Sequence, residues 1–420
     1  MAVGDVVGLV VVVVLVALGV LVVVKGRRRK GQGRAVSGEV PVPRLRVVAL
    51  GVQGSGKTVL LTGMYRKLQS PGDRGFHLKV PFDQLIELNR WYREVAGSDT
   101  GWPAGTTRKD MREFDFGVMT TVGDRAATVF DIGYLEYPGE LLTDPDAPGS
   151  TAQQQLLAAV PEADALIGII DGLRVLQAHQ GDRRGLSVLH TTLDAMVHCM
   201  LTVRAPIAFV ITKWDVLDQL HEDENTRLEM VRDLLMEVDG FRDLVTVHSA
   251  RRVVRLIPVT AVGHDFAVLD GDTVRKRPDG RFQPANVELV LSAVVPDVLQ
   301  QVELAVDVRT RQAIMAEAQR RLRVGPAEAL RTLTAFVAER AAKAVAATAG
   351  GFTAAGLALL LESRAEPDPG YQERLSALDE ADRWAEEFIQ ARRRVVRRLQ
   401  DQVAVFEGRL PASRLRGDAP

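Results

Sequence analysis

Residues 51–58 read Gly-Val-Gln-Gly-Ser-Gly-Lys-Thr and directly follow an apolar, β-branched run at residues 45–50. This is the GxxxxGK[ST] spacing at the end of a strand, which is typical of a P-loop that holds nucleotide phosphates. Glycines allow a tight turn in which successive N–H groups point at one anion, and the helix expected from Lys57 adds its positive end. We expect Lys57 to reach the β- and γ-phosphates and the Thr58 hydroxyl to bind Mg²⁺. The expected phosphate-binding residues are Gly51, Gln53, Gly54, Ser55, Gly56, Lys57, Thr58 and Val59.

Two later segments could select the base, because a P-loop alone does not distinguish ATP from GTP. The tetrapeptide Thr212-Lys213-Trp214-Asp215 follows the strand-like run 206–211. Asp215 could accept hydrogen bonds from guanine N1–H and the exocyclic amine, a pair of donors that adenine lacks. The aliphatic stem of Lys213 could pack over the base plane. At the end of the last strand-like run, Thr260-Ala261-Val262 resembles the [S/T]Ax loop of GTPases, and the resemblance implies that a backbone N–H there contacts the guanine carbonyl.

A carboxylate for the metal ion is expected at Asp131. The hydrophobic run Ala127–Phe130 precedes it. A hydrophobic strand that ends in Asp is the Walker B arrangement, in which the carboxylate holds Mg²⁺, usually through water. The expected metal ligands are Thr58, Asp131 and a threonine of a switch loop before the hairpin, for which Thr106 is preferred over Thr107.

In this order, and each at a strand end, these motifs resemble the P-loop GTPases of the translation-factor-related (TRAFAC) class. Within that class the chain resembles bacterial membrane-associated domains of the double-GTPase type. The resemblance covers about residues 44–300. It implies a six-stranded sheet, Mg²⁺-dependent hydrolysis of GTP and two switch loops that become ordered with the nucleotide.

The second switch departs from the family pattern. The family's DxxG would place glycine at position 134, where this chain has Tyr134. Either Gly133 or Gly139 could instead supply the N–H that senses the γ-phosphate. No glutamine follows to orient the attacking water, and Glu140 could do so. With Lys57 it forms the expected catalytic pair, and hydrolysis is expected to be slow without a partner.

The elements that must position these residues alternate between strands and helices. We expect an α/β fold of three layers, with helices on both faces of a mostly parallel sheet and one antiparallel strand from a hairpin. Gly123-Asp124 fits the short turn of that hairpin. The expected strands are 45–50, 114–122, 125–131, 165–171, 207–212 and 253–260, and the expected helices are 57–69, 82–96, 153–160, 186–203 and 222–238.

From about residue 285 the pattern predicts long helices and no further strand. Residues 350–361 are more apolar, and we interpret them as a buried helix rather than a second membrane segment, because the stretch is short and closely bracketed by charges. The arginines at 392–398 form either a solvated helix face or a contact with anionic lipid or a partner. The expected divisions are 44–300 for the P-loop GTPase domain and 301–410 for a helical region.

The N-terminal residues differ in composition from the rest. Val6–Val24 contains no polar side chain, and nineteen helical residues span about 28 Å, close to the hydrocarbon core of a bilayer. A cleaved signal peptide is the rival interpretation, but no basic residue precedes the run and no small-x-small cleavage site follows it. Basic residues at 25–30 place the following chain in the cytoplasm. We therefore expect a single-pass cell-membrane anchor at 1–30 and a flexible linker at 31–43.

Composition excludes several other classes. The net charge is −1, so no global basic field indicates nucleic acid, and the single Cys199 excludes an internal disulfide or a cysteine zinc site. The hypothesis is a membrane-anchored nucleotide switch that hydrolyses GTP with Mg²⁺, with an effector or activating protein and a homodimer as expected partners. The alternatives are a non-hydrolysing GTP-binding scaffold, an ATPase, and a membrane-remodelling protein built around the helical tail.

Overall fold

The computed structural model describes residues 42–97, 100–104, 112–136, 139, 151–271, 273–321, 336 and 371–416. The described residues belong to one compact unit, residues 40–420. Several predicted features lie outside the described residues: the anchor at 1–30, the switch threonine Thr106, Glu140 and the apolar stretch 350–361. Among the described residues, no helix is both long enough and apolar enough to cross a membrane.

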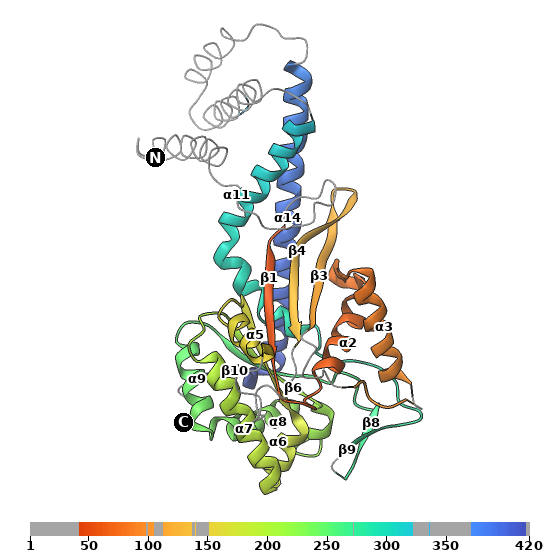
Figure 1. Cartoon of the computed structure of the whole chain (residues 1–420), viewed down its shortest axis with the longest axis vertical. Helices are drawn as coiled ribbons and strands as arrows, with labels where there is room; N and C mark the ends of the chain where they lie inside the picture. Colours follow the sequence, from red (N-terminus) through yellow and green to blue (C-terminus); the bar gives the residue numbers. More distant parts are fainter. Residues whose placement is uncertain are drawn as a thin grey trace. The chain divides into compact units, whose positions relative to one another are not determined.

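An eight-stranded sheet organises the fold (Figure 1). Its order is β10-β7-β6-β5-β1-β4-β3-β2. The strands from β7 to β4 are parallel, whereas β3 is antiparallel to β4, β2 to β3, and β10 to β7. The strand bounds are β1 (Arg44–Leu50), β2 (Phe76–Lys79), β3 (Arg112–Val122), β4 (Arg125–Glu136), β5 (Ala165–Asp171), β6 (Ile207–Thr212), β7 (Val254–Pro258) and β10 (Arg414–Leu415).

The mostly parallel sheet with an antiparallel hairpin strand is confirmed, and two edge strands change its extent. Six strands match the expected set, and β2 and β10 extend the sheet to eight. The prediction of no strand after residue 285 is wrong, because Arg414 and Leu415 pair with the free edge of β7. A two-residue strand carries no periodicity, so only the pairing reveals it.

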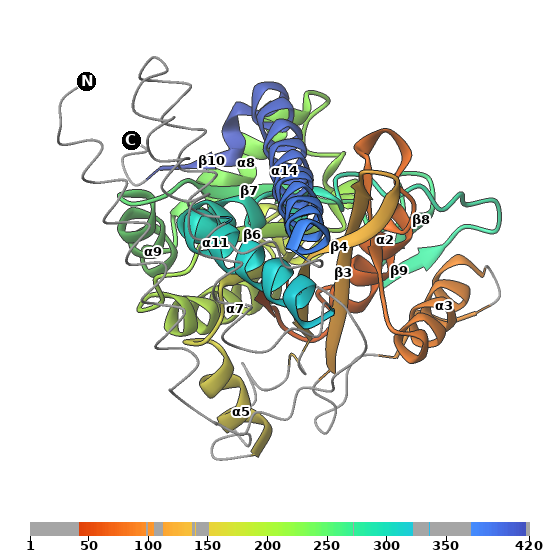
Figure 2. The ribbon, with the colours of Figure 1, turned by 90° about the horizontal axis from the view of Figure 1, so that it is seen from above.

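The middle strands of the sheet are covered on both faces. Every residue of β5 and of β6 is buried, as expected of parallel strands that have helices on both sides. In Figure 2, α5, α7 and α9 lie on one side of the sheet and α14 lies on the other. The helix bounds are α2 (Lys57–Leu68), α3 (Phe82–Ala96), α5 (Thr151–Ala159), α6 (Gly172–His179), α7 (Arg183–Met200), α8 (Glu224–Met236), α9 (Asp239–Ser249), α10 (Leu289–Ser292), α11 (Val295–Arg321) and α14 (Tyr371–Arg409).

The five helices expected before residue 285 are present, and the structure adds others. α7 begins three residues earlier than expected, because the Asp182 side chain accepts hydrogen bonds from two N–H groups of its first turn. The short α6, α9 and a separate hairpin, β8 (Ala267–Asp270) with β9 (Thr273–Lys276), were not expected from the sequence. The 3₁₀ turns are η1 (Gly72–Arg74), η2 (Trp214–Leu217) and η3 (Pro411–Ser413).

The C-terminal helix α14 is part of the sheet's packing. It lies along α11 and against β3 and β4, and Ala385 and Phe388 are buried in the main core. Arg392 is buried, and its guanidinium pairs with Asp307 of α11. The adjacent Arg393 pairs with the same carboxylate at 2.7 Å. These two arginines therefore hold α11 to α14, and the alternative of an anionic surface contact does not apply to them.

Candidate nucleotide-binding site

The P-loop joins β1 to α2 in the conformation that its glycines permit. Gly54 and Gly56 have φ angles of 79° and 84°, a left-handed region that other L-residues rarely adopt. Gly56 is the N-cap of α2, which begins at Lys57 as predicted. Gly51 has no room for a side chain, because a Cβ there would lie 2.9 Å from Ser55 Oγ. Gln53 and Gly54 are exposed at the loop tip, whereas Ser55, Lys57 and Thr58 are buried and Val59 is partly buried.

The Lys57 ammonium lies inside the loop. Its Nζ donates to the carbonyl oxygens of Gly51 at 2.8 Å and of Val52 at 3.0 Å. Burial lowers the pKa of Lys57 to about 8, and the nearby Glu136 carboxylate acts in the opposite direction. A phosphate in the loop would favour the charged form of this group.

Glu136, rather than Asp131, is the carboxylate beside the P-loop. The Thr58 hydroxyl donates to Glu136 Oε1 at 2.6 Å. β4 continues through residues 132–135 and ends at Glu136, which lies opposite Ala49 near the end of β1. Asp131 lies opposite Arg44, at the start of β1. The predicted strand end at Asp131 is therefore wrong, and this residue lies at the edge of the sheet away from the P-loop.

The position of Glu136 also distinguishes Gly139 from Gly133, the two glycines that could sense the γ-phosphate. A Cβ at Gly139 would lie 2.3 Å from the backbone nitrogen of Gln53, so Gly139 packs directly on the P-loop. Gly133 lies beside the side chains of Arg44 and Glu113 at the other end of β4. Glu136 and Gly139 are separated by two residues, as in DxxG with Glu in place of Asp. This spacing was available in the sequence once the apolar run was followed past Asp131.

The segment Thr212–Asp215 is bonded to the P-loop. Thr212 is buried, and its Oγ1 donates to the Ser55 carbonyl at 2.6 Å. Lys213 has φ 52°, and its Nζ donates to the Gly54 carbonyl at 3.0 Å. The same Nζ forms an ion pair with Asp171 at 2.8 Å, at the end of β5. Asp171 was not predicted, although it ends a fully apolar strand next to β6.

Asp215 lies in a partly buried position at the start of η2. Burial raises the pKa of its carboxyl group to about 6, while the nearby His264 has the opposite effect. The backbone of this segment is fixed to the next strand end, because Trp214 N–H donates to the Val259 carbonyl at 3.1 Å. Asp215 and Thr260 are thereby brought to the same edge of the sheet.

The third predicted segment, Thr260–Val262, is held by a later stretch of chain. Thr260 exchanges backbone hydrogen bonds with Ala285, and Gln283 N–H donates to the Val262 carbonyl at 2.8 Å. The Ala261 carbonyl lies against α2, where a Cβ at Gly63 would approach it to 2.6 Å. Both segments predicted to select the base therefore lie beside the P-loop.

The donor set fits a nucleotide-bound magnesium ion. Thr58 and Glu136 offer a hydroxyl and a carboxylate, the oxygen ligands that Mg²⁺ prefers. Within the described ranges, no group of three or more His, Cys, Asp or Glu side chains could hold a metal ion by itself. A metal ion at this position would therefore need phosphate oxygens and water to complete its coordination.

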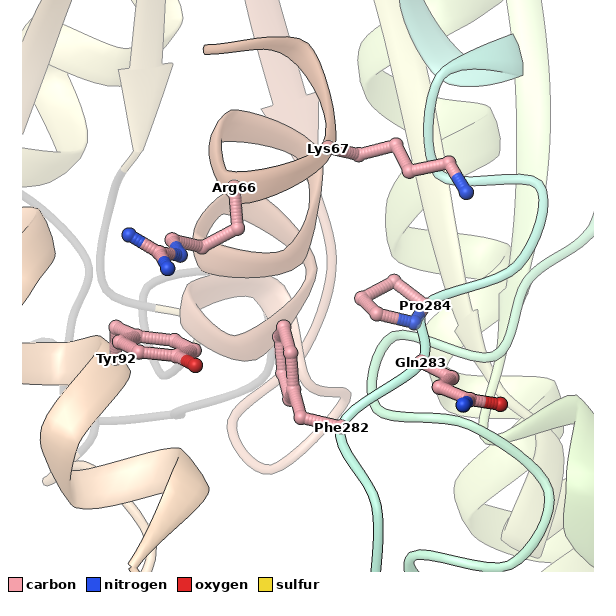
Figure 3. Close-up of a pocket in the computed structure, with 6 residues that line it drawn as sticks. All are labelled: Arg66, Lys67, Tyr92, Phe282, Gln283 and Pro284. Carbon is pink, nitrogen blue, oxygen red and sulfur yellow. The ribbon is translucent and has the colours of Figure 1, made fainter. Parts of the chain in front are cut away.

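A hollow of about 590 Å³ lies further along α2, away from this edge. Figure 3 shows Arg66 over the ring of Tyr92, whereas Lys67 extends in the opposite direction, above Pro284. The Arg66 guanidinium carbon lies 3.9 Å from the Tyr92 ring centroid. The two cations do not converge, so we assign no anion site to this hollow.

A scan against protein-family models and a search of curated proteins found no match. Among solved structures, the chain is similar to Sup35 complexed with GDP, at 14% identity over 56% of this chain and 41% of Sup35, with a TM-score of 0.28. It is also similar to translation elongation factor SelB from Methanococcus maripaludis, in complex with the GTP analogue GppNHp. That match has 14% identity over 52% of this chain and 30% of SelB, with a TM-score of 0.26. Each match spans less than half of the other protein.

Similarity at such TM-scores does not define a fold, so the class of protein rests on the chain's own architecture. That architecture is a mixed α/β fold with a mostly parallel central sheet, a P-loop after β1 and a helical C-terminal part. It fits a P-loop GTPase.

Proposed function

We propose that this protein is a membrane-anchored GTPase that hydrolyses GTP to GDP and phosphate with Mg²⁺ and acts as a nucleotide-dependent switch. One observation carries the proposal. The P-loop bonds directly both to Glu136, through Thr58, and to Thr212 and Lys213 of the base-selecting tetrapeptide. Residues distant in sequence thus form a single site with a phosphate end and a base end.

The base end favours guanine. Asp215 presents a carboxylate, which can accept two hydrogen bonds but donate none when ionised. Guanine offers two adjacent donors on its N1–H and exocyclic amine, whereas adenine offers no such pair. Bound adenine would place a hydrogen-bond acceptor against this partly buried carboxylate, which costs binding energy.

The phosphate end supports positioning and charge neutralisation rather than covalent catalysis. Lys57 and the backbone N–H groups of the P-loop would bind the phosphates. Thr58 and Glu136 would hold Mg²⁺, which would neutralise phosphate charge. We further propose that Gly139 senses the γ-phosphate, that Thr106 is a metal ligand in the first switch, and that Glu140 orients the attacking water. Turnover is expected to be slow until a partner protein completes the site.

The membrane part of the proposal rests on the sequence. The apolar run Val6–Val24 and the basic residues after it support a single-pass anchor in the cell membrane with the folded unit in the cytoplasm. An effector or activating protein, and a second copy of the chain, are the proposed partners.

The decisive test is Asp215→Asn in the full chain, purified in a neutral detergent. The change should lower GTP affinity about 10- to 100-fold, because it removes the charged acceptor of two hydrogen bonds, and should raise affinity for xanthosine triphosphate. Asp243→Asn, at an exposed carboxylate on α9, is the control and should change neither. Competition between GTP and ATP is measured in the same assay. Preference for ATP, or unchanged GTP binding by Asp215→Asn, would refute the guanine assignment. GTP binding without turnover would instead identify a non-hydrolysing scaffold.

A further inference from the structure

Four arginines line a second hollow, of about 600 Å³, where the last residues of the described chain meet the end of α9. Arg251 and Arg252 belong to the loop before β7, and Arg414 and Arg416 belong to β10 and the residue after it. Because β10 pairs antiparallel with β7, chain segments about 160 residues apart bring their cations together.

These arginines are incompletely neutralised. Arg414 pairs with Glu407, which also pairs with Arg255 at 2.7 Å. Arg252 Nη2 donates to Gln301 at 3.0 Å, while its Nη1 is buried and has no hydrogen-bond partner. Arg251 and Arg416 are exposed, and neither forms an ion pair with a described residue. A buried guanidinium nitrogen without a protein acceptor can be satisfied by a water molecule or by a bound anion.

Helix α9 explains only part of this charge. Its C-terminal end carries about half a negative charge, which two arginines nearby would offset. Together with Arg255, however, five guanidinium groups pair with only two carboxylates among residues 42–416 that the structure describes, those of Glu407 and Asp297. The excess positive charge also acts on His248. Burial lowers the pKa of His248, and the charges of Arg252 and Arg251 lower it further.

Exposed apolar side chains adjoin the arginines. Val253 lines the hollow and is 40% exposed, and Val247, on the last turns of α9, is 47% exposed. Leu201 is 40% exposed at the end of α7, which the His248–Met200 contact at 3.2 Å joins to α9. Cations with exposed aliphatic groups between them are the composition of a surface that enters the interfacial region of a bilayer.

The strand register places this surface at a particular edge of the sheet. Parallel pairing through β5 and β6 puts the start of β7 at the same edge as the start of β1. Val254 is level with Val48, so the two starts are three strand spacings apart across the sheet and four residues apart along it, about 20 Å in all. The chain therefore enters β1 at this edge, whereas the P-loop leaves β1 at the opposite edge.

We propose that the hollow formed by Arg251, Arg252, Arg414 and Arg416 binds the phosphate of an anionic phospholipid headgroup. Val253 and its apolar neighbours would lie against the interfacial region. The nucleotide edge would then face away from the bilayer and stay accessible to partners. The proposal shares with the proposed function only the membrane anchor, and the two can fail separately.

The experiment uses the full chain in lipid nanodiscs, with Cys199→Ala and Val253→Cys carrying an environment-sensitive fluorophore. Discs of phosphatidylcholine alone are compared with discs that also contain phosphatidylglycerol. We expect a blue shift and quenching by lipid-borne quenchers only with the anionic lipid.

Arg251→Glu with Arg416→Glu should abolish the response, since each arginine near an anionic surface contributes about fivefold to binding. Arg183→Glu with Arg184→Glu, exposed at the nucleotide edge, should leave it unchanged. A fluorophore at Leu186→Cys, also at that edge, should not respond.

Other outcomes of this experiment would overturn the headgroup site, and two further readouts test the anchor and the nucleotide site separately. A response in neutral discs, or one that survives the Arg251/Arg416 reversal, would overturn the headgroup site. Titration of neutral discs with pyrophosphate tests the soluble source of the same chemistry, and a shift with pyrophosphate but none with anionic lipid would also overturn the lipid assignment. Retention of the chain in neutral discs reports on the anchor, and GTP binding by the same sample reports on the nucleotide site.

Discussion

Glu136 interacts with both the Lys57 ammonium and the Thr58 hydroxyl at the start of α2. It accepts the hydrogen bond of the Thr58 hydroxyl and opposes the lowering of the Lys57 pKa by burial. A buried carboxylate at a strand end, adjacent to both a cation and a hydroxyl, is suited to a metal ion that also contacts phosphate. At the scale of single residues, this contact decides where Mg²⁺ would bind.

Glu136→Gln should reduce the dependence of GTP binding on Mg²⁺ and lower turnover about 10- to 100-fold, the usual effect of disturbing a metal environment. The amide can still accept the Thr58 hydrogen bond, so the fold should persist. Asp131→Asn is the matched control, because Asp131 lies at the other edge of the sheet. Titration of Mg²⁺ at fixed GTP provides the measurement. Loss of Mg²⁺ dependence in Asp131→Asn, with Glu136→Gln unaffected, would restore the sequence-based assignment.

The same site should bind GTP most tightly between pH 6 and 8. Below the pKa of Asp215, about 6, its protonated carboxyl no longer accepts two hydrogen bonds, and above the pKa of Lys57, about 8, the ammonium loses its charge. Affinity should fall by about tenfold per pH unit beyond either limit. Calorimetric titration across the range measures this, and residual GTP binding by Asp215→Asn should retain only the alkaline decrease. A flat profile for the wild type would contradict it.

At the scale of elements, the β8–β9 hairpin holds the chain before the first predicted switch. Lys276 is buried, and its Nζ donates to the carbonyls of Gly97, Thr100 and Gly101 at 3.0–3.1 Å and to that of Glu94. Trp102 Nε1 donates to the Val274 carbonyl at 2.8 Å. The hairpin thereby satisfies the carbonyl end of α3, a general need of helix termini.

Lys276→Met should destabilise the protein by about 1–3 kcal/mol, because several buried carbonyl groups lose their donor. Lys67→Met, an exposed lysine on α2, should have little effect. Chemical denaturation followed by circular dichroism measures both variants. If Lys276→Met matched Lys67→Met in stability, the hairpin would not anchor this segment.

At the scale of the whole molecule, residues after 285 return to the sheet twice. α14 covers β3 and β4, and β10 then pairs with β7 on the far edge. Asp307 and Arg392 fix α11 to α14, with Arg392 also donating to Thr310 at 3.1 Å. The sheet and the C-terminal helices are therefore expected to unfold together.

Asp307→Ala should cost about 3–5 kcal/mol, because it leaves the buried Arg392 without its carboxylate. Replacing both partners, with Asp307→Leu and Arg392→Met, should recover most of the loss, since Arg393 keeps Glu303 at 2.8 Å. Urea denaturation monitored through the tryptophans gives the free energies of unfolding. A double variant as unstable as Asp307→Ala would show that the helix pair needs the charges themselves.

The sequence by itself determined the P-loop, the tetrapeptide 212–215 that we propose selects the base, and the strands β5 and β6. Each is specified by residue type at fixed local spacing, and a fully buried strand must be apolar throughout. Only the tertiary structure decided that Glu136 and Gly139, rather than Asp131 and Gly133, lie beside Lys57. The end of β4 depends on its register with β1, which is set by pairing across the sheet and not by the local pattern. For the same reason, β10 and the arginine hollow that it completes became visible only when residues far apart in the chain were brought together.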